Sequence, residues 1–183
     1  MNTPVFNIRD YVNNYPEIRG IKPFFSTVPV IPEYPSDKDV IGSLECAGQI
    51  HKAVRNFVQP YLRPGIKLTD IAELIELKTE ELTSQVKGAK PVNKGIGFPV
   101  GISINECAAH FHPLPGSSQV INKDDVVKID FGVEANSWII DSAFTISFNS
   151  KYDPLLDAVR DATYTGIKTI GIDLNIAEWG AHI

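Results

Sequence analysis

Apolar residues recur every three or four positions in three stretches of the chain, and this spacing predicts three amphipathic helices. The stripe of the first helix consists of Val40, Leu44, Ala47, His51, Val54 and Val58. We expect Ser36 to cap this helix, because a hydroxyl accepts hydrogen bonds from the first free backbone N–H groups. The proline- and glycine-containing segment 60–65 then ends it.

The two later helices have similar start signals. Thr69 is the predicted cap of the second helix, which runs to just before Gly88. Asp153 is the predicted cap of the third, and Pro154 occupies its first helical position, where a missing N–H costs nothing. These patterns place helices before and after the central part of the chain.

Between the helices, the chain changes to short runs of glycine, proline, β-branched and aromatic residues. Segments 126–133 and 138–148 alternate between apolar and polar residues, which is typical of strands. A short polar turn separates them, so they are predicted to form an antiparallel hairpin. A two-residue turn at Ala135-Asn136 would place Asp130 directly opposite Asp141 on one face.

This predicted pair of aspartates suggests a functional site. Two opposed carboxylates about 5 Å apart repel by roughly 3 kcal/mol at an effective dielectric of about 20. Three explanations remain open: the register differs, one carboxyl is protonated, or a cation lies between them. Apolar residues flank Asp141, so we expect it to be buried, where a charge needs a partner or a metal. The alternative is a solvated sheet face with two unrelated acids.

The first 36 residues differ in character from the rest. Six of the 13 prolines lie there, and no helical or alternating pattern persists among them. We predict an extended, Pro-rich N-terminal strap over residues 1–36, anchored by its aromatic side chains, and one domain over residues 37–183.

A short internal similarity indicates a repeated unit. Residues 65–73 and 171–178 share the order Gly-Ile-x-Leu-x-x-Ile-Ala-Glu, with one residue fewer in the second copy. The second copy predicts a helix that begins after an Asn175 cap. Any two helix–turn–helix units share some of these features, so the similarity has an ordinary explanation as well.

Composition narrows the classes of partner. The chain has 17 Lys+Arg against 22 Asp+Glu, a formal net charge of −5. This acidic balance, without a basic cluster, argues against nucleic acid and anionic membrane surfaces as partners. No apolar run approaches the roughly 20 residues of a membrane span. Two cysteines and no signal-peptide pattern favour a cytoplasmic protein.

One histidine is a candidate for catalysis. His110 lies in the segment 105–112, and Ala108 and Ala109 leave room beside it for a ligand. A single histidine is more often structural than catalytic, and we assign that ordinary role to His112.

Taken together, the motifs resemble the methionine aminopeptidase type 2 family. They are Gly97-Phe98-Pro99, Asn105-Glu106-Cys107-Ala108-Ala109-His110, Lys128-Ile129-Asp130-Phe131-Gly132 and Ile140-Asp141-x-Ala143-Phe144-Thr145. The spacings of 20 residues from His110 to Asp130 and 11 from Asp130 to Asp141 also match. The resemblance covers about residues 37–183.

The resemblance implies a fold, a reaction and a set of roles. The fold would be the α/β (α+β) pita-bread fold, here its first half plus the opening helices of the second, with an antiparallel sheet and helices on one face. Asp130 would bind one of two divalent metal ions (Co, Mn, Fe or Zn), and Asp141 would bridge both. His110 would contact the scissile peptide, and Phe98 would wall the methionine pocket. The substrates would be nascent polypeptides beginning with Met and a small residue, with the ribosome as a further candidate partner.

The chain also departs from that family. The family site needs three more metal ligands, a histidine and two glutamates, from the second half, and His182 comes too early to be that histidine. We therefore expect residues 37–183 to be an incomplete catalytic domain, inactive alone. Two alternatives remain: a non-catalytic pita-bread binding protein, and a half-domain that acts as an interaction fragment.

Overall fold

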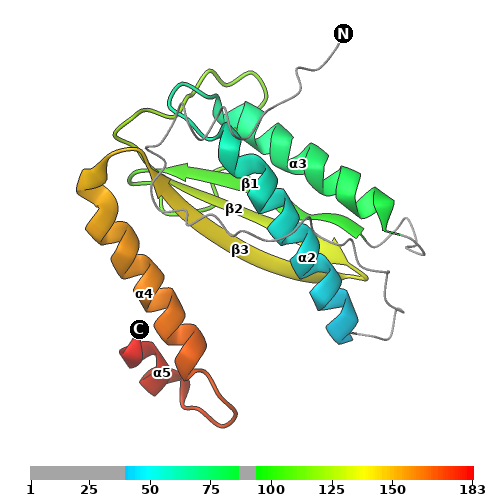
Figure 1. Cartoon of the computed structure of the whole chain (residues 1–183), viewed down its shortest axis with the longest axis vertical. Helices are drawn as coiled ribbons and strands as arrows, with labels where there is room; N and C mark the ends of the chain where they lie inside the picture. The colour runs from blue at the N-terminus through cyan, green and yellow to red at the C-terminus, as the bar shows by residue number, and fades with distance from the viewer. Residues whose placement is uncertain (1–39, 87–93) are drawn as a thin grey trace.

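The computed structural model describes residues 40–86 and 94–183. The predicted strap and its Ser36 cap lie outside the described residues, as does Gly88. The elements follow in the order α2 (Val40–Val58), η1 (Gln59–Tyr61), α3 (Leu68–Gln85), β1 (Lys94–Ile104), β2 (Val126–Ala135), β3 (Trp138–Ser147), η2 (Ser150–Tyr152), α4 (Asp153–Thr169) and α5 (Ile176–His182). Figure 1 shows them from the N-terminal helices to the C-terminal pair.

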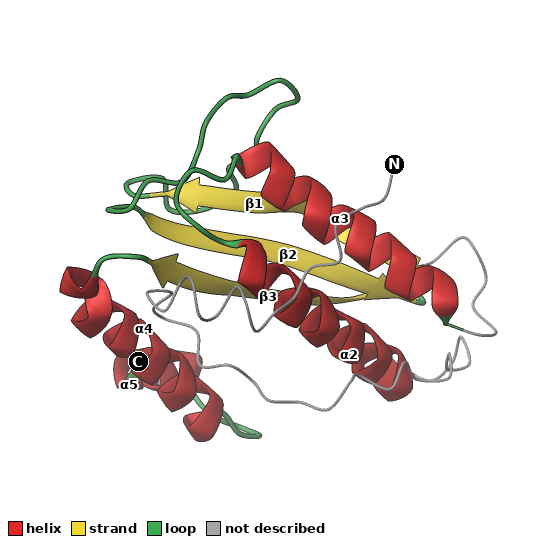
Figure 2. Ribbon diagram, turned by 45° about the horizontal axis from the view of Figure 1, so that its top comes forward, coloured by secondary structure: helices red, strands yellow, loops and turns green. Residues whose placement is uncertain are grey.

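The three strands form one antiparallel sheet in the order β1-β2-β3. Helices α2 and α3 cover one face of it, with α3 over β1 and α2 over β2 and β3 (Figure 2). The period of two in β2 explains this arrangement, because Val127, Ile129, Phe131 and Val133 are fully buried while Lys128, Asp130 and Glu134 on the other face are only partly buried. The predicted α+β class, with helices on one face of an antiparallel sheet, is confirmed.

The register of the β2–β3 hairpin differs from the predicted one. The turn consists of Asn136 and Ser137, so Ala135 pairs with Trp138 and Asp130 pairs with Ala143 rather than with Asp141. Both turn residues have positive φ angles, 52° and 67°. A two-residue turn that matches the strand twist needs this conformation, and asparagine adopts it more readily than alanine. Asn136 also donates a hydrogen bond to Ser43 Oγ on α2 at 3.1 Å, which fixes the hairpin tip.

Strand β1 is an edge strand with an irregular register. Its pairing with β2 shifts between Ile96 and Phe98 and again between Phe98 and Gly101. Pro99 lies in the second irregularity, where its missing N–H interrupts no regular ladder. This segment is a single strand of 11 residues, which its glycines and proline make difficult to recognise from the sequence.

Two of the predicted helix caps need correction. Helix α3 begins at Leu68, and no side chain caps it, so Thr69 is not its cap. Instead, the segment around Gln119 runs beside this turn, and Gln119 O accepts a hydrogen bond from Leu68 N at 3.0 Å. Asp153 is the first residue of α4 rather than its cap. The Asn175 cap is confirmed, since its Oδ1 accepts a hydrogen bond from Ala177 N at 2.9 Å.

Helices α4 and α5 form a second helix–turn–helix after the strands, in agreement with the internal similarity. Trp179 Nε1 donates to Gly166 O at 2.9 Å and joins the two helices. In Figure 1 the pair stands beside the sheet, and several apolar side chains of α4, including Val159 and Ile167, are exposed. Within 40–86 and 94–183, no helix combines the length and apolar character that crossing a membrane requires.

Candidate active site

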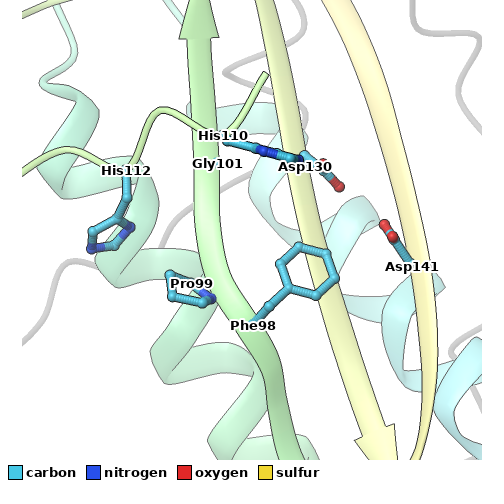
Figure 3. Close-up of a pocket in the computed structure, with 7 residues that line it drawn as sticks. All are labelled: Phe98, Pro99, Gly101, His110, His112, Asp130 and Asp141. Atoms are coloured by element: carbon cyan, nitrogen blue, oxygen red, sulfur yellow. The ribbon is translucent and has the colours of Figure 1, made fainter.

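A pocket of about 420 Å³ lies on the face of the sheet opposite α2 and α3. It is lined by Phe98, Pro99, Gly101, His110, His112, Asp130 and Asp141. The structure thus brings all four residues predicted for the site into one pocket, from the three strands of the sheet and a loop (Figure 3). Their individual roles remain predictions.

Asp130 and Asp141 share a face although they are not directly paired. Asp130 lies opposite Ala143, and Asp141 lies opposite Gly132. The two aspartates are therefore diagonal neighbours, a relation in which side chains on one face still interact. In Figure 3 their carboxylates point toward each other. Asp141 is exposed rather than buried as predicted, because no described helix covers this face of β3.

The described residues do little to stabilise the negative charge of the Asp130 carboxylate. Its Oδ1 is buried and has no hydrogen-bond partner there. Burial raises the pKa of Asp130, and the negative charge of Asp141 raises it further, while His110 opposes the shift. A cation beside the two carboxylates would offset both the cost of burying the Asp130 charge and its repulsion by Asp141, so the site fits a bound metal ion. No group of three or more His, Cys, Asp or Glu that could hold a metal occurs in the described ranges.

This raised pKa predicts a pH-dependent gain in stability for Asp130→Asn. The folded chain holds a proton on Asp130 more readily than the unfolded chain, so the charged form costs stability above the raised pKa and not below the unfolded value. In metal-free buffer at pH 7, we expect the variant to melt about 2 °C higher than the wild type. The difference should shrink as the pH falls towards about 4. Thermal unfolding measures it, and a gain that is independent of pH would contradict this explanation.

His110 reaches the pocket from a loop that folds back along β1. Phe111 O accepts a hydrogen bond from Ile102 N at 2.7 Å, and Phe111 N donates to Ser103 Oγ at 3.3 Å. Directly before this anchored residue, His110 has a φ of 64°, which is unfavourable for a residue other than glycine. Such strain persists only where neighbouring contacts enforce it, and it is common at functional sites.

A side-chain network at the start of the loop holds it in place. Asp125 is buried and accepts hydrogen bonds from Asn105 Nδ2 at 2.9 Å and from Asn122 N at 2.7 Å. Asn105 Oδ1 in turn accepts one from Val126 N at 2.9 Å. The sequence motif includes Asn105 but not Asp125, which lies 20 residues later. The only sequence signal for Asp125 was its position directly before a predicted strand.

Phe98 forms the apolar wall of the pocket by packing over Gly132. A Cβ atom at position 132 would lie 2.4 Å from the Phe98 ring, so only glycine allows this contact. Pro99 continues the apolar surface. His112 also lines the pocket, and its Nδ1 lies 2.9 Å from Val100 O, so it is a part of the site that the prediction missed. Its position two residues after His110 was the available signal.

Comparisons with known proteins agree with this geometry. The sequence profile of metallopeptidase family M24 matches residues 42–183. A methionine aminopeptidase 2 of Puccinia graminis f. sp. tritici is 46% identical over 151 residues, which are 82% of this chain and 32% of that protein. A methionine aminopeptidase 2 of Saccharomyces cerevisiae is 49% identical over 138 residues, 74% of this chain and 33% of that protein. The chain therefore spans about a third of the length of these curated relatives.

Solved structures show the same fold at lower sequence identity. A dipeptidase from Pyrococcus horikoshii superposes with a TM-score of 0.64 at 23% identity, over 79% of this chain and 38% of that one. A methionine aminopeptidase from Rickettsia prowazekii gives a TM-score of 0.56 at 19% identity, over 74% of this chain and 53% of that one. These likenesses support the predicted fold class.

Proposed function

Because this chain belongs to metallopeptidase family M24, we propose that it supplies the metal-binding sheet of a methionine aminopeptidase. The reaction is the removal of the initiator methionine from nascent polypeptides. Identity of 45–49% to proteins with that name, over most of this chain, supports it. The structural observation that carries it is the buried, unpartnered Asp130 Oδ1 beside Asp141 in a pocket that His110 also lines.

The two aspartates would hold the metal in this proposal. Asp130 and Asp141 place two carboxylates on one face, no lysine or arginine is among the described residues that line the pocket, and carboxylates suit divalent cations such as Mn²⁺. We further propose that the complete site binds two such ions, drawn from Co, Mn, Fe or Zn. When bound, such ions supply Lewis-acid polarisation of a carbonyl and a nucleophile usable at neutral pH. The described residues contribute two carboxylates to the four to six ligands such ions usually take.

The other pocket residues would bind and orient the peptide. Phe98 and Pro99 present an apolar wall suited to an unbranched, flexible side chain such as methionine. His110 is exposed at the pocket, so its ring is free to hydrogen-bond the first peptide unit and to handle its proton. Nascent N-termini beginning with Met and a small residue are the proposed substrates, in the cytoplasm where such chains emerge. Residues 37–183 would belong to the catalytic domain and residues 1–36 to a separate strap.

A chimera tests this proposal directly. Residues 40–183 replace the matching third of the Saccharomyces cerevisiae relative, and release of free methionine from Met-Ala-Ser is measured with Mn²⁺ or Co²⁺. We expect the chimera to release methionine and the 183-residue chain alone to release none, because two carboxylates are too few to hold a catalytic metal pair. A folded chimera that binds metal but does not cleave would favour the non-catalytic binding protein. Cleavage by the isolated chain would overturn the assignment of a partial site.

A further inference from the structure

His51 differs from the other three histidines of the chain, all of which lie in the described ranges. It is only 4% exposed, whereas His110, His112 and His182 are exposed. It projects from α2 onto the covered face of the sheet, where its ring stacks in parallel on Phe131 with centroids 4.0 Å apart. Its Nε2 lies 3.0 Å from Phe131 O. A leucine would fill such a position in an apolar stripe, so the polar ring calls for an explanation.

The hydrogen bond fixes the state of the ring. A carbonyl only accepts, so Nε2 carries the hydrogen and donates it to Phe131 O. Burial lowers the pKa of His51 more than its contacts with the Phe131 and Ser142 backbones raise it, so the ring is neutral at pH 7. His51 thus offers the sheet one directed donor, at Phe131 O, rather than a charge.

The position of these contacts links His51 to the pocket on the other side of the sheet. Phe131 follows Asp130 directly, and Ser142 follows Asp141. Phe131 and Ser142 are also paired with each other across β2 and β3. Because successive side chains alternate between faces, the residues that precede this pair face the pocket. His51 therefore contacts β2 at the residue paired with Ser142 of β3, beneath the point where the two strands carry the carboxylates.

We propose that His51 is a positioning residue that fixes the separation of Asp130 and Asp141. It does so by holding the Phe131–Ser142 pair against α2, so that the two strands keep one spacing and one twist at this point. The consequence for metal binding and catalysis rests on the proposed function, whereas the effect on the strand pair does not.

The first test concerns the strand pair in the full 183-residue chain. Three variants are compared: His51→Leu keeps apolar bulk but loses the donor, His51→Gln keeps a donor, and Val54→Ala weakens α2 packing elsewhere on the buried face. Amide hydrogen exchange is measured by NMR. We expect His51→Leu to speed exchange at Phe131 and Ser142 at least tenfold relative to the flanking pairs of the same hairpin. His51→Gln should restore most of the protection, and Val54→Ala should not act selectively on this pair.

The second test uses the chimera and separates the two proposals. We expect His51→Leu to lower kcat at least tenfold with KM within about threefold, and to change the visible absorption spectrum of bound Co²⁺. His51→Gln should recover kcat to within about threefold of the unmutated chimera, while Val54→Ala lowers the melting temperature without this loss. Unchanged exchange at Phe131 and Ser142 in His51→Leu, or equal losses in the Leu and Gln variants, would overturn the positioning role. An inactive unmutated chimera with the expected exchange pattern would overturn only the proposed function.

Discussion

The Asp141→Asn chimera is expected to release methionine more than about 100-fold more slowly than the unmutated chimera. An asparagine amide has the size of the carboxylate but carries no charge, so it binds a divalent cation weakly. Residues that only support a metal ligand typically cost 10–100-fold in affinity or activity when they are changed, and loss of a ligand itself costs more. Metal content and kcat, measured on the same preparation, report whether the loss follows the metal.

Glu134→Gln provides the matched control for this substitution. Glu134 lies on β2, on the same face of the sheet as Asp130, but it does not line the pocket. We expect this variant to keep full metal content and turnover, because the change removes one negative charge without touching the site. Full turnover by Asp141→Asn with metal still bound would show that Asp141 is not a ligand.

The common face of Asp130 and Asp141 was predictable from the sequence even though their pairing was not. A strand exposes alternate residues on one face, so a register error of two residues leaves every side chain on the face first assigned to it. The predicted turn was displaced by one residue, from Ala135-Asn136 to Asn136-Ser137, which shifts the register by two. The two carboxylates therefore remain neighbours, although as a diagonal pair.

Features that depend on distant parts of the chain were not predictable in the same way. The start of α3 is determined by the segment around Gln119, which supplies the hydrogen-bond acceptor expected of Thr69. The exposure of Asp141 depends on what covers its face of the sheet, and its apolar neighbours in sequence carry no information about that. Strand β1 was hidden because its irregular register accommodates glycines and a proline that usually exclude a strand.

Asp125 illustrates a residue that local patterns cannot identify and whose loss should have a large effect on stability. It is 6% exposed and accepts hydrogen bonds from Asn105 Nδ2, Asn122 N and Asn122 Nδ2 at 2.9, 2.7 and 3.1 Å. Alanine would leave these donors without their acceptor. Since a hydrogen bond to a charged group contributes about 1.5–3 kcal/mol and these donors can turn to water, we expect Asp125→Ala to lose about 3 kcal/mol of unfolding free energy. In a chain of this size that loss lowers the melting temperature by about 6–12 °C.

The loss should also loosen the loop that carries His110, because Asn105 at its start is held by Asp125 and Val126. The half-buried Cys107 in this loop reports the change through its rate of reaction with a thiol reagent, while buried Cys46 on α2 is the internal reference. We expect Asp125→Ala to speed modification of Cys107 more than that of Cys46. The neighbouring exposed Asp124, changed to alanine, is the control and should shift the melting temperature by less than about 2 °C. If Asp125→Ala melts like that control, the network does not hold the loop, and the strained backbone of His110 must be enforced by its contacts with β1 alone.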